Sequence, residues 1–162
     1  MRIGSVALVL FLASPSFANA APIDLNDFFF FAGDPVTIAP DGSSATISED
    51  PVRAPILLSN DPGLGDPFVI DTSVGTILSF DFVVTEPVGT GDDDEFGAFV
   101  LDSTGASPGA AFEFFIQSTG SGSVSFDIAS LAPPAEPFLG LQFQLSSLPA
   151  DGATGSSVTV SN

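Results

Sequence analysis

Hydrophobic and polar residues alternate along several segments of this chain with the period of a β-strand. The clearest segment is 76–84, in which every second residue is large and apolar: Leu78, Phe80, Phe82 and Val84. Segments 123–128, 139–145 and 157–161 repeat the pattern, with Ser, Asp, Gly, Gln or Thr on the opposite side. A period of two with one polar side is typical of strands that bury a single face. The pattern therefore predicts four one-sided strands.

Weaker alternation predicts further strands at 28–31, 36–39, 45–48, 56–59, 68–71, 96–101 and 111–117. No window carries a sustained helical stripe, and 16 Gly and 14 Pro punctuate the chain. Pairs such as Asp41-Gly42 and Asp151-Gly152 supply turns, because glycine tolerates positive φ. Short strands with frequent turns, and no internal repeat, indicate an all-β domain: an antiparallel two-sheet β-sandwich or a closed barrel.

Four consecutive phenylalanines, Phe28 to Phe31, stand out in the N-terminal part. Strand alternation would point two of them into the core and two outward. Burial of the whole run near the N-terminal edge is the favoured interpretation. Exposed rings would instead form an adhesive contact or an aggregation hazard.

The first twenty residues have the zones of a secretory signal peptide. Arg2 provides the positive charge, 6–13 is a short apolar run, and Ala18-Asn19-Ala20 is a small-x-small cleavage pattern. The apolar run is too short to span a bilayer, which needs about 20 residues. We therefore expect a cleaved leader at 1–20, a single β-sandwich domain at 21–162 without a transmembrane segment, and a location outside the cytoplasm, secreted or at the cell surface.

Residue types that are missing exclude several kinds of chemistry. The chain has no Cys and no His, which removes disulfides, thiolate sites, the Ser-His-Asp triad and His-ligated zinc. It also has no Lys, Trp or Tyr, whereas it has 17 Phe. Phenylalanine must therefore fill the core, and no catalytic constellation emerges, so we expect a protein that is not an enzyme.

The charge balance is extreme, with 20 acidic residues against two basic ones and a net charge of −18. Binding to nucleic acid or to anionic membranes depends on Lys and Arg, so neither is expected as a partner. Carboxylates without counter-charges must be solvated, screened by salt or bridged by cations.

The densest acidic cluster is Asp92, Asp93, Asp94 and Glu95. Four adjacent carboxylates repel one another, and Ca²⁺, which takes six to eight oxygen ligands, would relieve that repulsion. The sequence therefore predicts a structural calcium site at these residues, although their spacing is not that of an EF-hand. A solvated acidic loop is the alternative, and it is the slightly favoured interpretation of the cluster. Secondary oxygen clusters, which only the fold could bring to such a site, are Glu49-Asp50 and Asn60-Asp61.

Several motifs resemble those of secreted bacterial jelly rolls. They are LGLQFQL at 139–145, the Asp151-Gly152 turn, GSSVTVSN at 155–162, the paired opening segments 33–38 and 41–49, and the central segments 78–82 and 93–96. The chain resembles the ectodomains of exported, exosortase-sorted (PEP-CTERM) surface proteins, which are similar to carbohydrate-binding modules. That resemblance implies a jelly roll and a structural calcium near Asp41, Glu49 and Asp151. The Pro-Glu-Pro motif, membrane helix and basic tail of those proteins do not follow Asn162, so we expect a truncated sequence or a released protein.

Three hypotheses about function remain open. The leading one is a non-enzymatic, exported β-sandwich with a cell-surface, extracellular-matrix or adhesion role, whose partners are polysaccharides or surface proteins. The alternative is a carbohydrate-binding module, in which Phe would replace the usual Trp and Tyr and in which Asp, Asn and Gln would bind hydroxyl groups. The third is a secreted hydrolase, which as a glycosidase would need two carboxylates about 5 to 9.5 Å apart.

Overall fold

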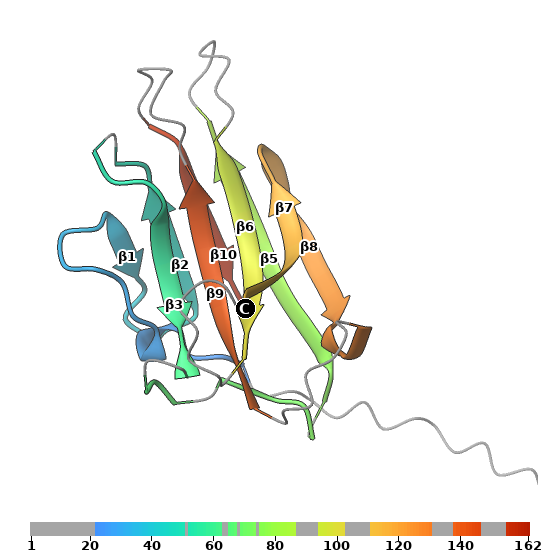
Figure 1. Cartoon of the computed structure of the whole chain (residues 1–162). Coiled ribbons are helices and arrows are strands. Elements are labelled where there is room, and N and C mark those ends of the chain that lie inside the picture. The colour runs from blue at the N-terminus through green and yellow to red at the C-terminus, as the bar shows by residue number, and fades with distance from the viewer. Residues whose placement is uncertain are drawn as a thin grey trace, which may run out of the picture.

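A computed structural model of the protein consists of two antiparallel β-sheets that pack face to face (Figure 1). The structure describes residues 22–50, 52–62, 65–67, 69–73, 75–86, 94–102, 111–130, 138–146 and 155–162. The leader expected at 1–20 lies outside these ranges, so it stays a prediction. Within them, no helix is long and apolar enough to cross a membrane.

The first sheet has the strand order β1-β2-β10-β5-β8, and the second has the order β3-β9-β6-β7. The strands of the first sheet are β1 (Val36–Ile38), β2 (Ser44–Ser48), β10 (Ser157–Ser161), β5 (Ile77–Thr85) and β8 (Gly120–Asp127). Those of the second are β3 (Ile56–Asn60), β9 (Phe138–Ser146), β6 (Glu95–Leu101) and β7 (Ala111–Gln117), and a short β4 (Ile70–Asp71) pairs with β9. Two single-turn 3₁₀ helices, η1 (Leu25–Asp27) and η3 (Ile128–Ser130), flank the strands.

Early and late strands pair in a nested order. Strand β2 pairs with β10, β3 with β9, β5 with β8, and β6 with β7. This nesting is that of a jelly roll, in which one folded-over ribbon of paired strands forms two sheets. The predicted all-β two-sheet sandwich is therefore confirmed. The closed barrel, which the alternation also allowed, is wrong, because the described strands form two separate ladders.

Strand β5 shows how the alternation directs side chains into the core. Its even-numbered residues, from Leu78 to Val84, are buried, and the residues between them are exposed. Strand β10 repeats this, with Val158 and Val160 buried. Of the predicted strand at 68–71, Ile70 and Asp71 form β4, and the Val69 N–H donates to the Leu139 carbonyl of β9 at 3.3 Å. Residue 68 lies outside the described residues.

Phenylalanine rings from four strands meet between the sheets. The rings of Phe80 and Phe82 in β5 lie 5.3 Å from Phe143 and 4.9 Å from Phe115, respectively, between centroids. Phe96 in β6 lies within 6.3 Å of all four of these rings. Tilted and edge-to-face pairs of this kind contribute about 0.5–1.5 kcal/mol each beyond the burial of area. The prediction that phenylalanine fills the interior is confirmed.

The run Phe28 to Phe31 is not buried as a whole, so the favoured interpretation of that run was wrong. Phe28 is buried and stacks on Phe143 at 6.2 Å, whereas Phe29 and Phe31 are 43% and 58% exposed. Only Phe29 bridges to the sheet, through two backbone hydrogen bonds with Ser59 of β3. A strand that adds to a sheet edge must alternate, so half of the run faces away from the core.

Replacing Phe96 tests the ring cluster. Phe96→Ala removes a fully buried ring and should lower the free energy of unfolding by about 3–5 kcal/mol. Phe31→Ala is the matched control, because the Phe31 ring is largely exposed. This variant should lower the free energy of unfolding by only about 1 kcal/mol, the contribution of one pair of aromatic rings. Urea unfolding measures both values. Equal losses for the two variants would contradict the assignment of Phe96 to the core.

Candidate functional site

The outer face of the second sheet combines aromatic rings with amide groups. Because Phe96 and Phe143 point into the core, their neighbours at odd spacing point outward. Cross-strand register then forms two rows: Phe29, Ser59, Gln142 and Phe99 in the first, and Leu57, Gln144, Gly97 and Ile116 in the second. We call this set of side chains, together with Phe31, the amide–phenyl face; it belongs to the front sheet of Figure 1.

The amides of the face form a chain along β9. Gln142 Nε2 donates to Gln144 Oε1 at 3.5 Å, and Gln144 Nε2 donates to Ser146 Oγ at 2.6 Å. Ser59 and Gln142 are each only 6% exposed, so they lie at the base of the first row. Among the described residues, Ser59 Oγ has no hydrogen-bond partner. The base of the row therefore holds an unused hydroxyl, the buried Ser59 Oγ, below the Gln142 amide and close to two rings.

The Phe99 ring lies over Gly97. A Cβ atom at position 97 would come 2.7 Å from Phe99 Cε2 and 3.0 Å from Cζ, so the ring occupies the space that a side chain would need. Because glycine has no side chain, the Phe99 ring can lie along the sheet at position 97. At the β3 edge, Phe29 and Phe31 meet edge to face at 5.1 Å and add a second aromatic surface.

The outer face of the first sheet is different in chemistry. Its hydroxyls largely bond to each other or to a carboxylate: Thr46 Oγ1 lies 2.9 Å from Thr159 Oγ1, and Ser123 Oγ donates to Asp81. Ile77 and Val83 are its exposed large apolar residues among those described, and neither is aromatic. This face therefore offers less free hydrogen-bonding capacity and no ring on which a ligand could stack.

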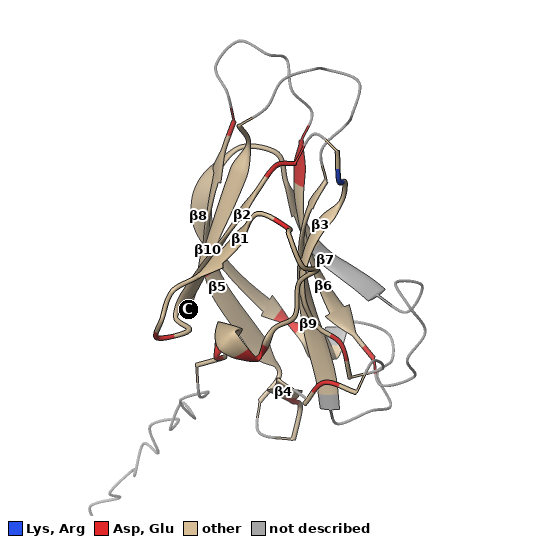
Figure 2. Ribbon diagram, turned by 90° about the vertical axis from the view of Figure 1, so that its left-hand side faces the viewer, with Lys and Arg blue, Asp and Glu red and all other residues tan. Residues whose placement is uncertain are grey.

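Acidic residues lie mostly at the two ends of the sandwich (Figure 2). Of the predicted calcium ligands, Asp92 and Asp93 lie outside the described residues. Asp94 is 0% exposed and Glu95 is exposed, so the strand directs these two side chains to opposite sides. No group of three or more His, Cys, Asp or Glu side chains that could hold a metal occurs in the described part. The site at Asp92–Glu95 stays a prediction.

The secondary oxygen clusters mostly serve the backbone. Glu49 Oε2 accepts from the N–H groups of Gly155 and Ser156 at 2.9 and 3.3 Å, and Asp50 Oδ1 accepts from the Val52 N–H at 2.8 Å. The Asn60 side chain donates to the Asp27 carbonyl at 3.3 Å. These contacts are turn and strand-end caps.

Asp41, which the resemblance implied as a calcium ligand, is also used locally. Its Oδ1 accepts from the hydroxyl and the N–H of Ser43 at 2.7 and 3.1 Å. These hydrogen bonds hold the pKa of the Asp41 carboxyl below its ordinary value. Asp151, which the resemblance also implied as a calcium ligand, lies outside the described residues.

The amide–phenyl face was not identified from the sequence. The alternation of 139–145 placed both glutamines opposite the core, which was a usable signal. Strand β6, by contrast, reads Glu-Phe-Gly-Ala-Phe-Val-Leu and has no polar residue after its first position. The side on which Phe99 lies therefore became known only from the pairing of β6 with β9.

The Asp41 pKa gives a test of the local hydrogen bonds. Ser43→Ala should raise the Asp41 pKa toward the ordinary value, as followed by NMR pH titration. A carboxyl whose pKa is lowered by folding stabilises the folded state above its unfolded pKa, and this stabilisation is lost as the pH falls through the folded pKa. The variant should therefore lose less stability on acidification. An unchanged Asp41 titration would contradict this assignment.

The position of the Phe99 ring can be tested at Gly97. Gly97→Ala should displace the ring, because its methyl group would overlap the ring edge. The change in stability should be small, since the far end of a side chain can move. NMR shifts of the Phe99 ring protons measure the displacement. Gly75→Ala is the control, because no atom lies within 4 Å of an added Cβ there. Identical ring shifts in both variants would contradict the proposed position.

Comparison with known proteins gives similarity in fold at low identity. No protein-family model matches the chain, and no curated protein matches it. A solved carbohydrate-binding module of family 29 is 14% identical, with a TM-score of 0.49 over 85% of this chain and 76% of that one. A variant of a family 29 module is 13% identical, with a TM-score of 0.48 over 85% and 78%. The enzymatically active domain of a bacteriophage tailspike protein is 14% identical, with a TM-score of 0.44 over 86% of this chain and 19% of that one.

Proposed function

We propose that this protein is an exported, non-catalytic carbohydrate-binding module that holds polysaccharide on the amide–phenyl face. The observation that carries the proposal is the row in which Phe29 and Phe99 flank Ser59 and Gln142. Binding sites for small molecules typically combine apolar and aromatic surface with a few placed polar groups. A sugar ring presents C–H groups on its faces, which suit the rings, and hydroxyls at its rim, which suit the amides.

The charge distribution supports a neutral ligand. Described carboxylates gather mostly at the ends of the sandwich (Figure 2), while Gln142, Gln144 and Ser59 carry hydrogen bonding on the face itself. Amide groups both donate and accept, as a polyhydroxyl ligand requires. Strand β6 contributes one carboxylate, Glu95 at its beginning, and Glu113 of β7 pairs with Phe99 at the end of the first row.

The same surface suits a role outside the cell. The expected leader at 1–20 and the resemblance to exosortase-sorted ectodomains support export to the cell surface or the extracellular matrix. A sandwich that binds polysaccharide there would attach a surface layer or matrix to the cell. The leading hypothesis from the sequence, a surface or adhesion role, and its alternative, a carbohydrate-binding module, thus become one proposal in which sugar binding provides the adhesion.

A non-catalytic role fits the residues available. The sequence has no His, Cys or Lys, and glycoside hydrolysis requires a pair of carboxylates that flank the bound sugar. By register, the carboxylate residues nearest the face are Glu95, at the beginning of β6, and Glu113 of β7, which pairs with Phe99. Four residues of β6 separate these two positions, roughly 13 Å at 3.3 Å per residue, which is more than a glycosidase pair spans. We therefore propose binding without turnover.

A glycan array followed by calorimetry on the best polysaccharide tests the proposal. Phe99→Ala should weaken binding by up to about tenfold, since a stacked ring contributes about 0.5–1.5 kcal/mol. Gln144→Ala should weaken it as well, by removal of a hydrogen-bonding group. Thr159→Ala, on the outer face of the first sheet, is the control and should bind as the unchanged protein does.

Two outcomes would contradict the proposal. Equal affinity of all three variants would place sugar binding elsewhere on the molecule, and no binding on the array would remove this function. Release of reducing ends from the bound polysaccharide, measured in the same samples, would show catalysis and favour the hydrolase hypothesis.

A further inference from the structure

At one end of the sandwich, strand alternation assigns four oxygen-bearing residues to the side that faces the other sheet. Residues two positions apart in a strand point to the same face of the sheet. Each of the four residues lies two positions from a buried core residue: Val84, Ile47, Val158 or Phe96. The four residues are Glu86 after β5, Glu49 after β2, Ser156 before β10 and Asp94 before β6. We call this set the interlayer oxygen cluster.

Backbone pairing places the members of the cluster at the same end. Ser157 pairs with both Ser48 and Thr85, so Glu49, Ser156 and Glu86 follow in a row across the first sheet. The Glu49 N–H donates to the Ser156 carbonyl at 2.9 Å, which continues the ladder by one residue.

Asp94 reaches this end from the second sheet. Glu95 pairs with Ser146, the last residue of β9. The residue before it in β9, Leu145, pairs with Ile56 at the beginning of β3. A bridge between Asp50 and Arg53 connects the end of β2 to the beginning of β3. Facing sheets lie about 10 Å apart, a gap that two opposed carboxylate side chains can close with one ion between them.

Three members of this cluster have buried oxygen atoms without hydrogen-bond partners among the described residues. Asp94 is 0% exposed, and neither of its carboxylate oxygens has a hydrogen-bond partner among the described residues. Glu86 Oε1 and Ser156 Oγ are likewise buried and unpartnered there. Burial of an unpaired carboxylate is costly, because water no longer stabilises the charge. An unsatisfied carboxylate in this position therefore indicates a missing positive ligand.

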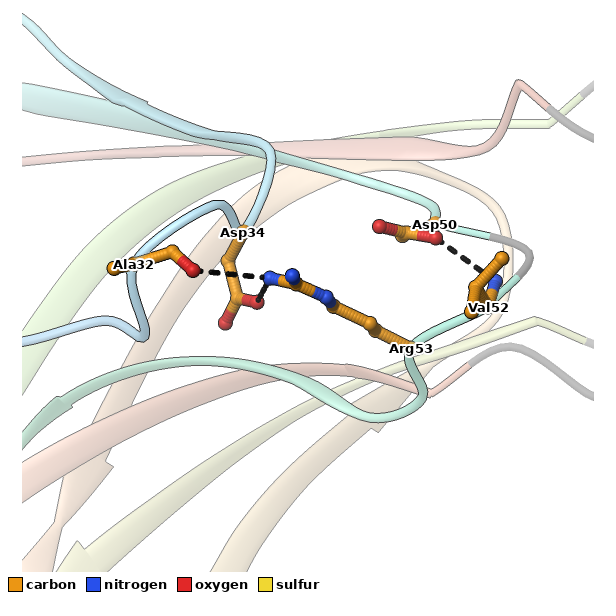
Figure 3. A network of polar contacts seen from close by, with 5 residues as sticks. All are labelled: Ala32, Asp34, Asp50, Val52 and Arg53. Atoms are coloured by element: carbon orange, nitrogen blue, oxygen red, sulfur yellow. Dashed lines mark hydrogen bonds and ion pairs between the residues drawn. The ribbon is translucent and has the colours of Figure 1, made fainter.

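The protein cannot supply that positive charge from its own described side chains. The sequence has only two basic residues, Arg2 and Arg53, and Arg2 lies outside the described residues. Arg53 Nη1 is engaged at 3.1 Å with Asp34 Oδ1 and at 3.1 Å with the Ala32 carbonyl (Figure 3). The counter-charge for Asp94 must come from solution.

We propose that the interlayer oxygen cluster binds one Ca²⁺ ion between the two sheets, with Asp94, Glu86 and Ser156 Oγ as protein ligands. The donors are all hard oxygens, and Ca²⁺ accepts such sets in flexible geometry with water in the remaining positions. No thiolate or imidazole is present in the sequence to favour zinc. Glu49 has a supporting role, since its carboxylate holds the N–H of Ser156.

This site differs from the one predicted at Asp92–Glu95. It keeps Asp94, but its other ligands are Glu86, which follows β5, and Ser156, which precedes β10, rather than neighbours in the sequence. Glu95 is excluded, because it faces away from the interlayer space. Bound calcium would tie the second sheet to the first independently of any sugar on the amide–phenyl face.

Calorimetric titration of the full mature chain with CaCl₂ alone tests this inference. We expect one ion per chain, and a melting temperature that rises in calcium and falls in EDTA. Asp94→Asn and Glu86→Gln should each weaken calcium binding tenfold or more. Glu95→Gln is the matched control, because it removes the same charge one residue away and should leave the affinity unchanged.

Ser156→Ala keeps the test decisive if Asp94→Asn fails to fold. It removes a proposed ligand at constant net charge and should also weaken the calcium affinity. Equal affinity losses in Asp94→Asn and Glu95→Gln would show diffuse screening of acidic charge and would overturn the site. A melting temperature indifferent to calcium and EDTA, with no heat of binding, would overturn it as well. Because these readouts use the ion alone, they are independent of whether the protein binds polysaccharide.

Discussion

The packing of phenylalanine rings between the two sheets is the interaction on which the rest of this structure depends. With no cysteine, tryptophan or tyrosine in the chain, the interior has to be filled by Phe together with aliphatic residues. Phe80, Phe96 and Phe143 meet from three strands and bring both sheets into contact. Since strands alternate strictly, anchoring one ring inward also determines where every neighbour in that strand points.

The two sites that we propose are both consequences of this anchoring. Phe96 points inward, so Phe99 faces out over Gly97, and Asp94 is drawn between the sheets. Phe143 points inward, so Gln142 and Gln144 face out beside Phe99. The same packing thus produces an aromatic and amide surface on one side of β6 and a buried carboxylate at its beginning.

Charge imposes the second constraint on this protein. A net charge of −18 is tolerable where carboxylates are solvated, as they are at loops and strand ends. A buried carboxylate such as that of Asp94 needs a compensating positive charge. Arg53 does not provide this charge, because it is paired with Asp34. In the proposed site, Ca²⁺ supplies this compensation from the surroundings, which suits a medium rich in salt or calcium.

The sequence by itself determined most of the strands, the side of β5 and β10 that is buried, and the chemistries excluded by missing His and Cys. These follow from local periodicity and composition, which do not depend on distant residues. Only the tertiary structure decided the jelly-roll pairing, the outward position of Phe29 and Phe99, and the separation of Asp94 from Glu95. Each of these depends on which strands become neighbours and in which register, and pairing between residues far apart in the chain leaves no local pattern.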